Sequence, residues 1–207
     1  MGGALRSAVP NLSGMLQVTP NGPWGKDVHP NMPVTIHELL QDLRECFRAG
    51  ATGVHLHVRD ETGAETLDPV VVNQTCRRVR EVAGEVGVAP EIGLTTGDWI
   101  VPELGRRKAM IREWEAVDCA TVNLSEKGFE DIMQVMLDSG IGIDVGLWAP
   151  AEMGMLLSSG FLPHVQRISI ELAPGEPHFL TGDPSDLAQQ VNDALDEAGC
   201  RVSLFID

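Results

Sequence analysis

Short apolar runs that end in polar residues recur along the chain, and each is followed by a longer segment with helical spacing. In the segment 35–49, Leu39, Leu43 and Phe47 recur at intervals of four residues, as on one face of a helix. The pattern therefore predicts alternating strands and helices. The expected strands are Gly14–Thr19, Thr52–Arg59, Glu91–Thr96, Ala120–Leu124, Gly142–Trp148, Gln166–Leu172 and Arg201–Ile206. The expected helices are Thr35–Ala49, Pro69–Ala83, Arg106–Glu115, Phe129–Ser139, Ala151–Ser159 and Pro184–Ala198.

Residues typical of helix ends stand at several of these boundaries. Thr35 followed by Glu38 predicts a capping box, in which each side chain satisfies a backbone N–H of the first turn. Glycines, which readily adopt the left-handed conformation that ends a helix, stand where four of the helices should stop. They are Gly50, Gly140, Gly160 and Gly199.

Strand–helix alternation with short connections indicates parallel βαβ units whose sheet is covered by helices. Seven strands allow either an open doubly wound sheet or a (β/α)8-type barrel. A dinucleotide-binding sheet should carry a glycine fingerprint after its first strand, whereas Thr19-Pro20-Asn21-Gly22 follows here. Polar residues at the strand ends favour the barrel, in which functional residues gather at that end. We expect one α/β domain over residues 1–207, a TIM-type barrel that is incomplete, with about seven strands.

Charge and composition exclude several classes of function. Fifteen basic against thirty acidic residues give a formal net charge of −15, which is unsuited to general nucleic-acid binding or to adsorption on anionic membranes. An anionic substrate would therefore need a local cationic site. No apolar run reaches the ~20 residues of a transmembrane helix, and residues 1–14 do not resemble a signal peptide. The four cysteines form no CxxC pair, which suits reduced thiols, so we expect a cytoplasmic protein.

The segment Val54-His55-Leu56-His57-Val58-Arg59-Asp60 carries the strongest local signal for chemistry. In a strand its two histidines and the arginine share one face, which places the imidazoles ~6–7 Å apart at the backbone, close enough to share a metal ion. The alternative is a solvent-facing edge strand, or histidines satisfied by backbone carbonyls. Because a buried parallel strand is normally apolar on both faces, we favour the metal. Candidates for a third ligand are Asp144, Glu171 and Asp207; an ion pair with Arg167 or Arg201 is the alternative for Glu171.

Hydroxyl and amide side chains end the third and fourth expected strands. Thr95, Thr96 and Gly97 can bind a carboxylate or a carbonyl oxygen, and Thr121 and Asn123 form a second polar face. The single basic cluster, residues 106–108, is expected to be a solvated helix face, with contact to the phosphates of a bulky anionic cosubstrate as the alternative.

Several of these motifs, taken in their order along the chain, resemble the β-keto acid cleavage enzyme family. The similarity covers about residues 16–172. The segments that carry it are Pro20-Asn21-Gly22, His29–Thr35, Ala49–Ala51, His55–Asp60, Leu67-Asp68-Pro69, Leu94–Gly97 and Ala120–Asn123. The resemblance implies a (β/α)8 barrel with a divalent metal, usually zinc. It also implies a retro-Claisen-type cleavage, in which a small β-keto acid and acetyl-CoA give acetoacetate and a new acyl-CoA.

The resemblance also implies roles for individual residues. His55 and His57 match the metal-binding histidines, Thr95 matches a substrate-holding hydroxyl, and Thr121 matches a threonine near the reacting centre. An acidic residue of the fifth strand falls at Gly146, and Asp144 on the same face is assigned its catalytic role. The remaining polar residues are assigned to substrate binding: Asn21, Arg59, Thr96, Gly97 and Asn123.

The family's third metal ligand lies in an Arg-x-Gly-Leu-Glu-Asp motif on the last strand, and that motif is not found in these 207 residues. We therefore expect either a shortened relative or a barrel completed by another subunit. Exposed edges of the first and last strands favour a homo-oligomer. A relative that has become a binding or structural subunit, without cleavage activity, remains the alternative function.

Overall fold

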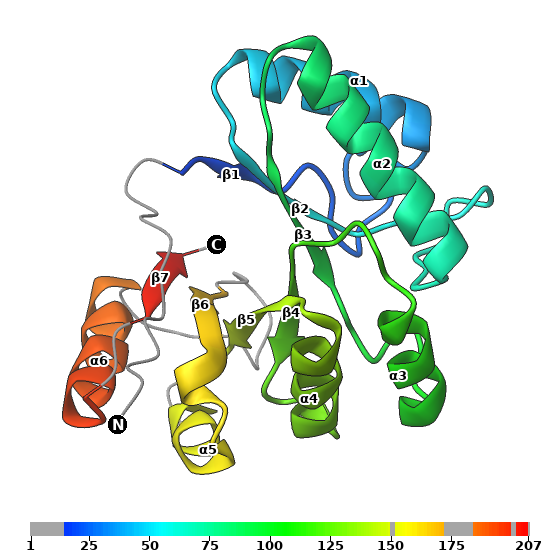
Figure 1. The fold of residues 1–207 in the computed structure, drawn as a ribbon. Helices are drawn as coiled ribbons and strands as arrows, with labels where there is room; N and C mark the ends of the chain where they lie inside the picture. The colour runs from blue at the N-terminus through cyan, green and yellow to red at the C-terminus, as the bar shows by residue number, and fades with distance from the viewer. Residues whose placement is uncertain (1–14, 150–151, 172–183, 200–201, 207) are drawn as a thin grey trace, which may run out of the picture.

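The computed structural model describes residues 15–149, 152–171, 184–199 and 202–206. Its centre is one sheet of seven parallel strands, in which the spatial order equals the order in the chain. The sheet curls so that its strands line an arc with the helices outside it (Figure 1). The strands are β1 (Gln17–Val18), β2 (Gly53–Leu56), β3 (Glu91–Thr95), β4 (Cys119–Asn123), β5 (Gly142–Leu147), β6 (Val165–Ile170) and β7 (Ser203–Ile206).

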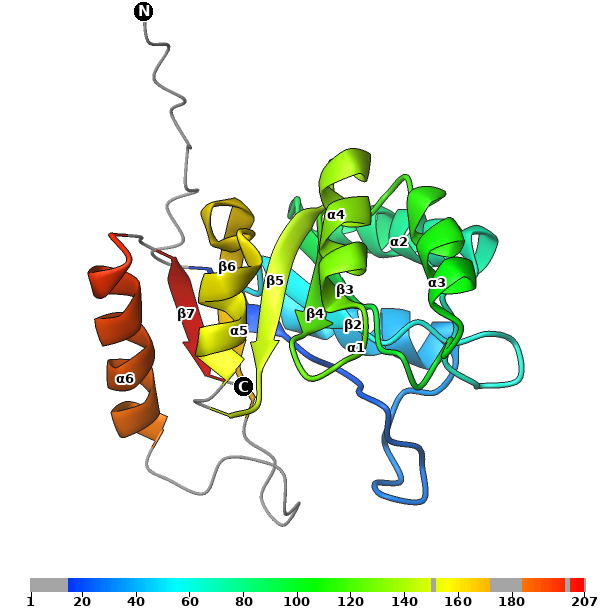
Figure 2. The same ribbon diagram turned by 90° about the horizontal axis from the view of Figure 1, so that it is seen from below.

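The described residues form six α-helices between the strands. The helices lie outside the arc (Figures 1 and 2). The capping box at Thr35 and Glu38 is confirmed, since Thr35 Oγ1 accepts the N–H of Glu38 and the Glu38 carboxylate accepts that of Thr35. All four glycines expected at helix ends have positive φ. The helices are α1 (Ile36–Arg48), α2 (Pro69–Glu85), α3 (Leu104–Arg112), α4 (Phe129–Ser139), α5 (Glu152–Ser159) and α6 (Pro184–Glu197), with a 3-10 turn at Leu162–His164.

The hydrophobic core lies between the outer face of the sheet and the helices. Val54 and Leu56 of β2, Leu43 of α1 and Val79 of α2 are fully buried there. Burial of such side chains contributes about 1.5–3 kcal/mol each to folding. With the outer face committed to the core, alternate residues of each strand point inside the arc.

The structure confirms the expected class, an α/β fold with an incomplete TIM-type barrel. Among the described residues β1 and β7 form the two ends of the sheet, and no ladder joins them. No helix in the described part of the chain has the length and apolar character needed to span a membrane.

The strand predicted for residues 52–59 ends early, because β2 stops at Leu56. The Asp60 carboxylate accepts the backbone N–H groups of Thr62 and Ala64 and stabilises a turn. The chain then runs back, and Arg59 pairs with Glu65 in an antiparallel bridge. This turn is what later places Glu65 beside His57.

The three cysteines in the described ranges, Cys46, Cys76 and Cys119, carry free thiols, as expected. Cys200 lies outside the described residues.

Candidate functional site

His55 lies on β2 and His57 follows the end of that strand, and their imidazoles lie together. The ring centroids are 5.5 Å apart, with an interplanar angle of 68°. Burial, together with the smaller effects of the neighbouring His57 and Arg167, lowers the pKa of His55 to about 3. His55 is therefore neutral at physiological pH, which is the form of imidazole that binds a metal.

Two polar side chains fix His57 from different directions. The Asn21 amide donates to the backbone oxygen of His57 at 2.9 Å and accepts its backbone N–H at 3.0 Å. The Glu65 carboxylate lies 2.6 Å from Nδ1 of the ring. Burial by itself would raise the pKa of Glu65. The effects of His57 and the hydrogen bond from Trp99 are together larger, so the pKa of Glu65 is lower than its ordinary value. Asn21, which we assigned to substrate binding, thus holds the backbone beside the histidine pair.

Trp99 lies over this arrangement from the connection between β3 and α3. Its Nε1 donates to Glu65 Oε2 at 3.0 Å, and its ring stacks on His57 with centroids 6.2 Å apart. The indole packs against Gly97, where a Cβ would overlap the ring. Gly97 therefore gives room to Trp99, and its N–H donates to Thr95 Oγ1.

The three threonines of the candidate site have different surroundings. Thr95 Oγ1 accepts the N–H of Gly97 at 3.2 Å, which leaves the hydroxyl proton of Thr95 available to a ligand. Thr96 instead donates its hydroxyl to the backbone oxygen of Thr121 at 2.7 Å and so links β3 to β4. Thr121 Oγ1 lies 3.5 Å from Nδ1 of His55, at the limit of hydrogen bonding.

Asn123, at the end of β4, is oriented by a buried ion pair. Its Nδ2 donates to Glu126 Oε1 at 2.9 Å, and Arg107 Nη1 lies 2.8 Å from Glu126 Oε2. Burial raises the pKa of Glu126 to about 7, against the opposing effect of Arg107. Asn123 Oδ1 is buried without a hydrogen-bond partner among the described residues, so this oxygen is available to a ligand. The expected solvated face at 106–108 is wrong for Arg107, whose side chain is 1% exposed.

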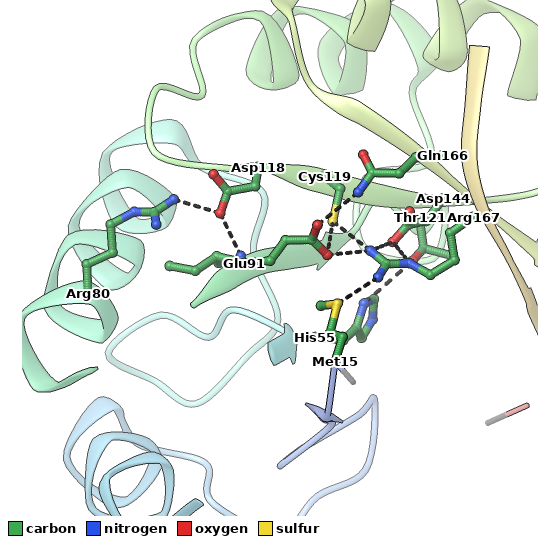
Figure 3. Close-up of polar contacts among 11 residues, drawn as sticks. Met15, His55, Arg80, Glu91, Asp118, Cys119, Thr121, Asp144, Gln166 and Arg167 are labelled. Atoms are coloured by element: carbon green, nitrogen blue, oxygen red, sulfur yellow. Dashed lines mark hydrogen bonds and ion pairs between the residues drawn. The ribbon is translucent and has the colours of Figure 1, made fainter. Parts of the chain in front are cut away.

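Asp144 lies inside the arc in a charged cluster around Arg167 (Figure 3). Arg167 Nη2 is 2.7 Å from Asp144 Oδ2, 2.6 Å from Glu91 Oε1 and 3.3 Å from Cys119 Sγ. Burial raises the pKa of Asp144 to about 6, although Arg167 opposes that shift. Asp144 Oδ1 has no hydrogen-bond partner in the described part of the chain. Arg167 therefore pairs with Asp144 and Glu91, two carboxylates that sequence reasoning did not connect with it.

Arg59 binds the backbone of two loops. Its guanidinium donates to the carbonyl oxygens of Gly63, Gly22 and Trp24 at 2.7–2.9 Å. This side chain, which we assigned to substrate binding, ties the segment after β1 to the turn after β2.

Glu171 follows β6 at the same end of the sheet. A Cβ built on Gly146 would lie 2.8 Å from Glu171 Oε1 and would overlap Asn123 Oδ1. Gly146 of β5 thus leaves space for the Asn123 amide oxygen from β4 on one side and the Glu171 carboxylate that follows β6 on the other. Asp207, the other acidic residue considered as a metal ligand, lies outside the described residues.

The histidine pair offers two donors of a kind that suits a divalent metal. His55 is neutral, and none of the described residues hydrogen-bonds to Nε2 of His57. Within the described ranges, no cluster of three or more His, Cys, Asp or Glu side chains is arranged to hold a metal. The described residues therefore supply two imidazole donors, whereas a catalytic zinc usually has three protein ligands.

Comparison with solved structures supports the barrel-type fold. A rubisco-like protein from Burkholderia fungorum superposes with a TM-score of 0.54 at 14% sequence identity, over 93% of this chain and 54% of that chain. At such identity the likeness concerns the fold alone.

Curated relatives point to one family. A 3-keto-5-aminohexanoate cleavage enzyme from Acetoanaerobium sticklandii is 21% identical over 188 residues, which cover 86% of this chain and 68% of the relative. A protein of the same name from Fusobacterium nucleatum is 24% identical over 139 residues, or 63% of this chain and 50% of the relative. The chain thus spans one half to about two thirds of these relatives. The model of the beta-keto acid cleavage enzyme family matches residues 14–204, so this chain belongs to that family.

Proposed function

We propose that this chain carries a divalent metal, zinc being the expected ion, at His55 and His57 and cleaves a small β-keto acid. In the proposed reaction, acetyl-CoA is the second substrate, and the products are acetoacetate and a new acyl-CoA. The observation that carries the proposal is the pair of imidazoles 5.5 Å apart at the end of β2, beside threonine and asparagine side chains of β3 and β4. Family membership supports β-keto acid cleavage as the reaction class.

His55 and His57 would hold the metal, since both imidazoles lie at the same end of β2 and His55 is neutral. A bound divalent ion supplies a Lewis acid that polarises a keto group and stabilises negative charge as a carbon–carbon bond breaks. The polar side chains around the pair would then bind and orient the substrate.

Each of these side chains has a defined group to offer. The Thr95 hydroxyl can donate to the substrate carboxylate, because its oxygen is already occupied by the N–H of Gly97. Asn123 Oδ1 can accept a hydrogen bond, because Glu126 holds the amide nitrogen. Asp144 Oδ1 is an acceptor without a partner among the described residues, and with a pKa of about 6 this carboxylate can take up a proton near neutral pH.

The experiment combines metal analysis with turnover. The purified chain and a His55→Ala/His57→Ala variant are analysed for bound metal, then incubated with acetyl-CoA and a panel of β-keto acids while acetoacetate is followed. We expect about one divalent ion per chain in the wild type, its loss in the variant, and acetoacetate only from the wild type. Absence of stoichiometric metal from the wild type would refute the metal site.

A second candidate function is that of a binding or structural subunit. It is favoured by one observation, the lack of a third protein ligand among the described residues. A wild type that binds metal but turns over no member of the substrate panel would support this candidate against cleavage activity.

We also propose a homo-oligomer. Strands β1 and β7 end the sheet without pairing to each other in the described part of the chain, and unpaired strand edges favour association. A second copy covering these edges would explain how they are protected. Light scattering that gives a stable monomer at micromolar concentration would refute this.

A further inference from the structure

We propose that Glu65 is a positioning residue for His57: it orients the imidazole so that Nε2 faces the candidate metal site. Trp99 and Asn21 restrain the same arrangement. The inference rests on the proposed function, in which His57 binds a divalent ion, and it adds residues to that site.

The first step concerns the ring nitrogens. Glu65 Oε1 lies 2.6 Å from Nδ1 of His57, and the two side chains are only 13% and 9% exposed. A carboxylate accepts hydrogen bonds and does not donate them, so Nδ1 carries the proton in this contact. In a neutral imidazole the lone pair then resides on Nε2, which becomes the nitrogen available to a metal.

The second step concerns the carboxylate itself. Its other oxygen, Oε2, accepts the indole N–H of Trp99 at 3.0 Å. The indole also stacks on the His57 ring, with centroids 6.2 Å apart and an interplanar angle of 23°. Because each oxygen of Glu65 has its own aromatic donor, rotation of the carboxylate would break one or both hydrogen bonds.

The third step concerns the backbone. The Asn21 amide makes two hydrogen bonds to the N–H and carbonyl of His57, so the residue is held at its backbone as well as at its ring. Asn21 follows β1, Glu65 precedes α2 and Trp99 precedes α3. Three connections from the same end of the sheet therefore converge on one imidazole. This convergence is the arrangement expected around a residue whose ring orientation matters.

The first measurement reports the tautomer in the metal-free protein. Protein labelled with ¹⁵N-histidine is recorded at pH 8 by long-range ¹H–¹⁵N correlation, and His57 is assigned with a His57→Gln variant. We expect the Nδ1–H tautomer in the wild type and a shift toward Nε2–H in Glu65→Ala. Glu65→Gln should also shift His57 toward Nε2–H, because the single amide oxygen is needed to accept the indole N–H of Trp99, which leaves the amide NH2 to donate to Nδ1.

The second measurement reports the affinity for Zn²⁺ alone, by competition with a chromogenic chelator. Loss of such an orienting partner typically weakens metal binding 10–100-fold, and we expect a loss of this order for Glu65→Ala and for Glu65→Gln. The matched control is Glu61→Ala, which removes an exposed acidic side chain from the same turn and should leave Zn²⁺ affinity unchanged.

The outcomes separate the inference from the function on which it rests. An Nε2–H tautomer in the wild type, or a tautomer and Zn²⁺ affinity unchanged in Glu65→Ala, would overturn the positioning role. If Glu65→Ala fails to fold, Glu65→Gln decides, because a tautomer and a Zn²⁺ affinity both unchanged in that variant would also overturn the positioning role. A wild type with the expected tautomer, shifted in Glu65→Ala, but without Zn²⁺ binding would support the positioning and refute the proposed metal.

Discussion

Arg167 and Asp144 form an ion pair inside the curled sheet, with Nη2 2.7 Å from Oδ2 and side chains that are 0% and 3% exposed. The same guanidinium lies 2.6 Å from Glu91 Oε1. Two carboxylates and one cation thus share an environment with little water. Desolvation of such groups is costly, and the arrangement persists because each carboxylate has the guanidinium as its partner.

Arg167→Met should therefore destabilise the fold strongly, because it leaves two carboxylates near one another without their cation. Removal of one partner of a buried ion pair costs about 3–5 kcal/mol, and urea unfolding should show a decrease of this size. Arg167→Met combined with Asp144→Asn should lose less than the sum of the two single changes, since each single change leaves charge uncompensated. If the loss of unfolding free energy in the double variant equals the sum of the two single losses, the two residues are not coupled.

The capping box of α1 predicts a dependence of stability on pH. The pKa of Glu38 is lowered to about 2 from an ordinary 4.5, first by Lys26 and then by the backbone N–H groups of Thr35 and Val34. A lowered pKa in the folded state means that the stabilisation is complete above the unfolded pKa and is lost as pH falls through about 2. The difference in unfolding free energy between wild type and Glu38→Gln should thus be constant from pH 7 to 6 and shrink below pH 4.5. A difference in unfolding free energy that grows as the pH falls would contradict this prediction.

Glu126 should contribute a pH dependence of stability with the opposite sign. Burial raises its pKa to about 7, so the folded protein holds a proton between about pH 4.5 and 7 that the unfolded chain releases. The contribution of this group to stability is therefore present at low pH and is lost as pH rises through 7. Arg107→Met, which removes the nearby cation, should raise the pKa of Glu126 further and make stability fall more steeply between pH 6 and 8. Urea midpoints measured across that range, with Glu126→Gln as the pH-insensitive control, test this.

The elements of the fold followed from local patterns, because the spacing of apolar residues reports which face of a strand or helix is buried. The histidine and threonine positions followed as well, since residues at the carboxyl ends of parallel strands meet at one edge. Arg107 was misjudged because its neighbours in sequence are charged. A signal was present, however: Arg107 and Ile111 are four residues apart, share a helix face and are both buried.

The partners of the site residues were harder to predict, since they depend on how loops return. Glu65 reaches His57 only because the turn stabilised by Asp60 brings the chain back beside Arg59. The Arg167–Glu91 contact joins residues 76 positions apart, on β6 and at the start of β3. Their approach depends on the curl of the whole sheet, which no local pattern encodes.

Thr95 and Thr96 are adjacent in sequence but should respond differently to loss of the hydroxyl. Thr96 is 1% exposed, and its hydroxyl donates to the backbone oxygen of Thr121. Thr96→Val therefore leaves that buried carbonyl with one hydrogen-bond partner fewer. We expect a loss of about 1 kcal/mol in unfolding free energy. The decrease in kcat/KM, expressed as a free energy, should be no larger than this loss.

Thr95→Val should instead act on substrate binding. The Thr95 hydroxyl accepts the N–H of Gly97 but keeps its own proton for a ligand, so its loss removes a donor at the end of β3. If that donor holds the β-keto acid carboxylate equally in the ground and transition states, KM rises while kcat is retained; if the bond tightens as the reaction proceeds, kcat falls as well. In either case kcat/KM should fall about 10-fold or more, as expected for a hydrogen bond to a charged group worth about 1.5–3 kcal/mol. Steady-state kinetics on both variants, compared with their urea midpoints, separate the two roles. A Thr95→Val enzyme with unchanged kcat/KM would exclude this hydroxyl from the substrate site.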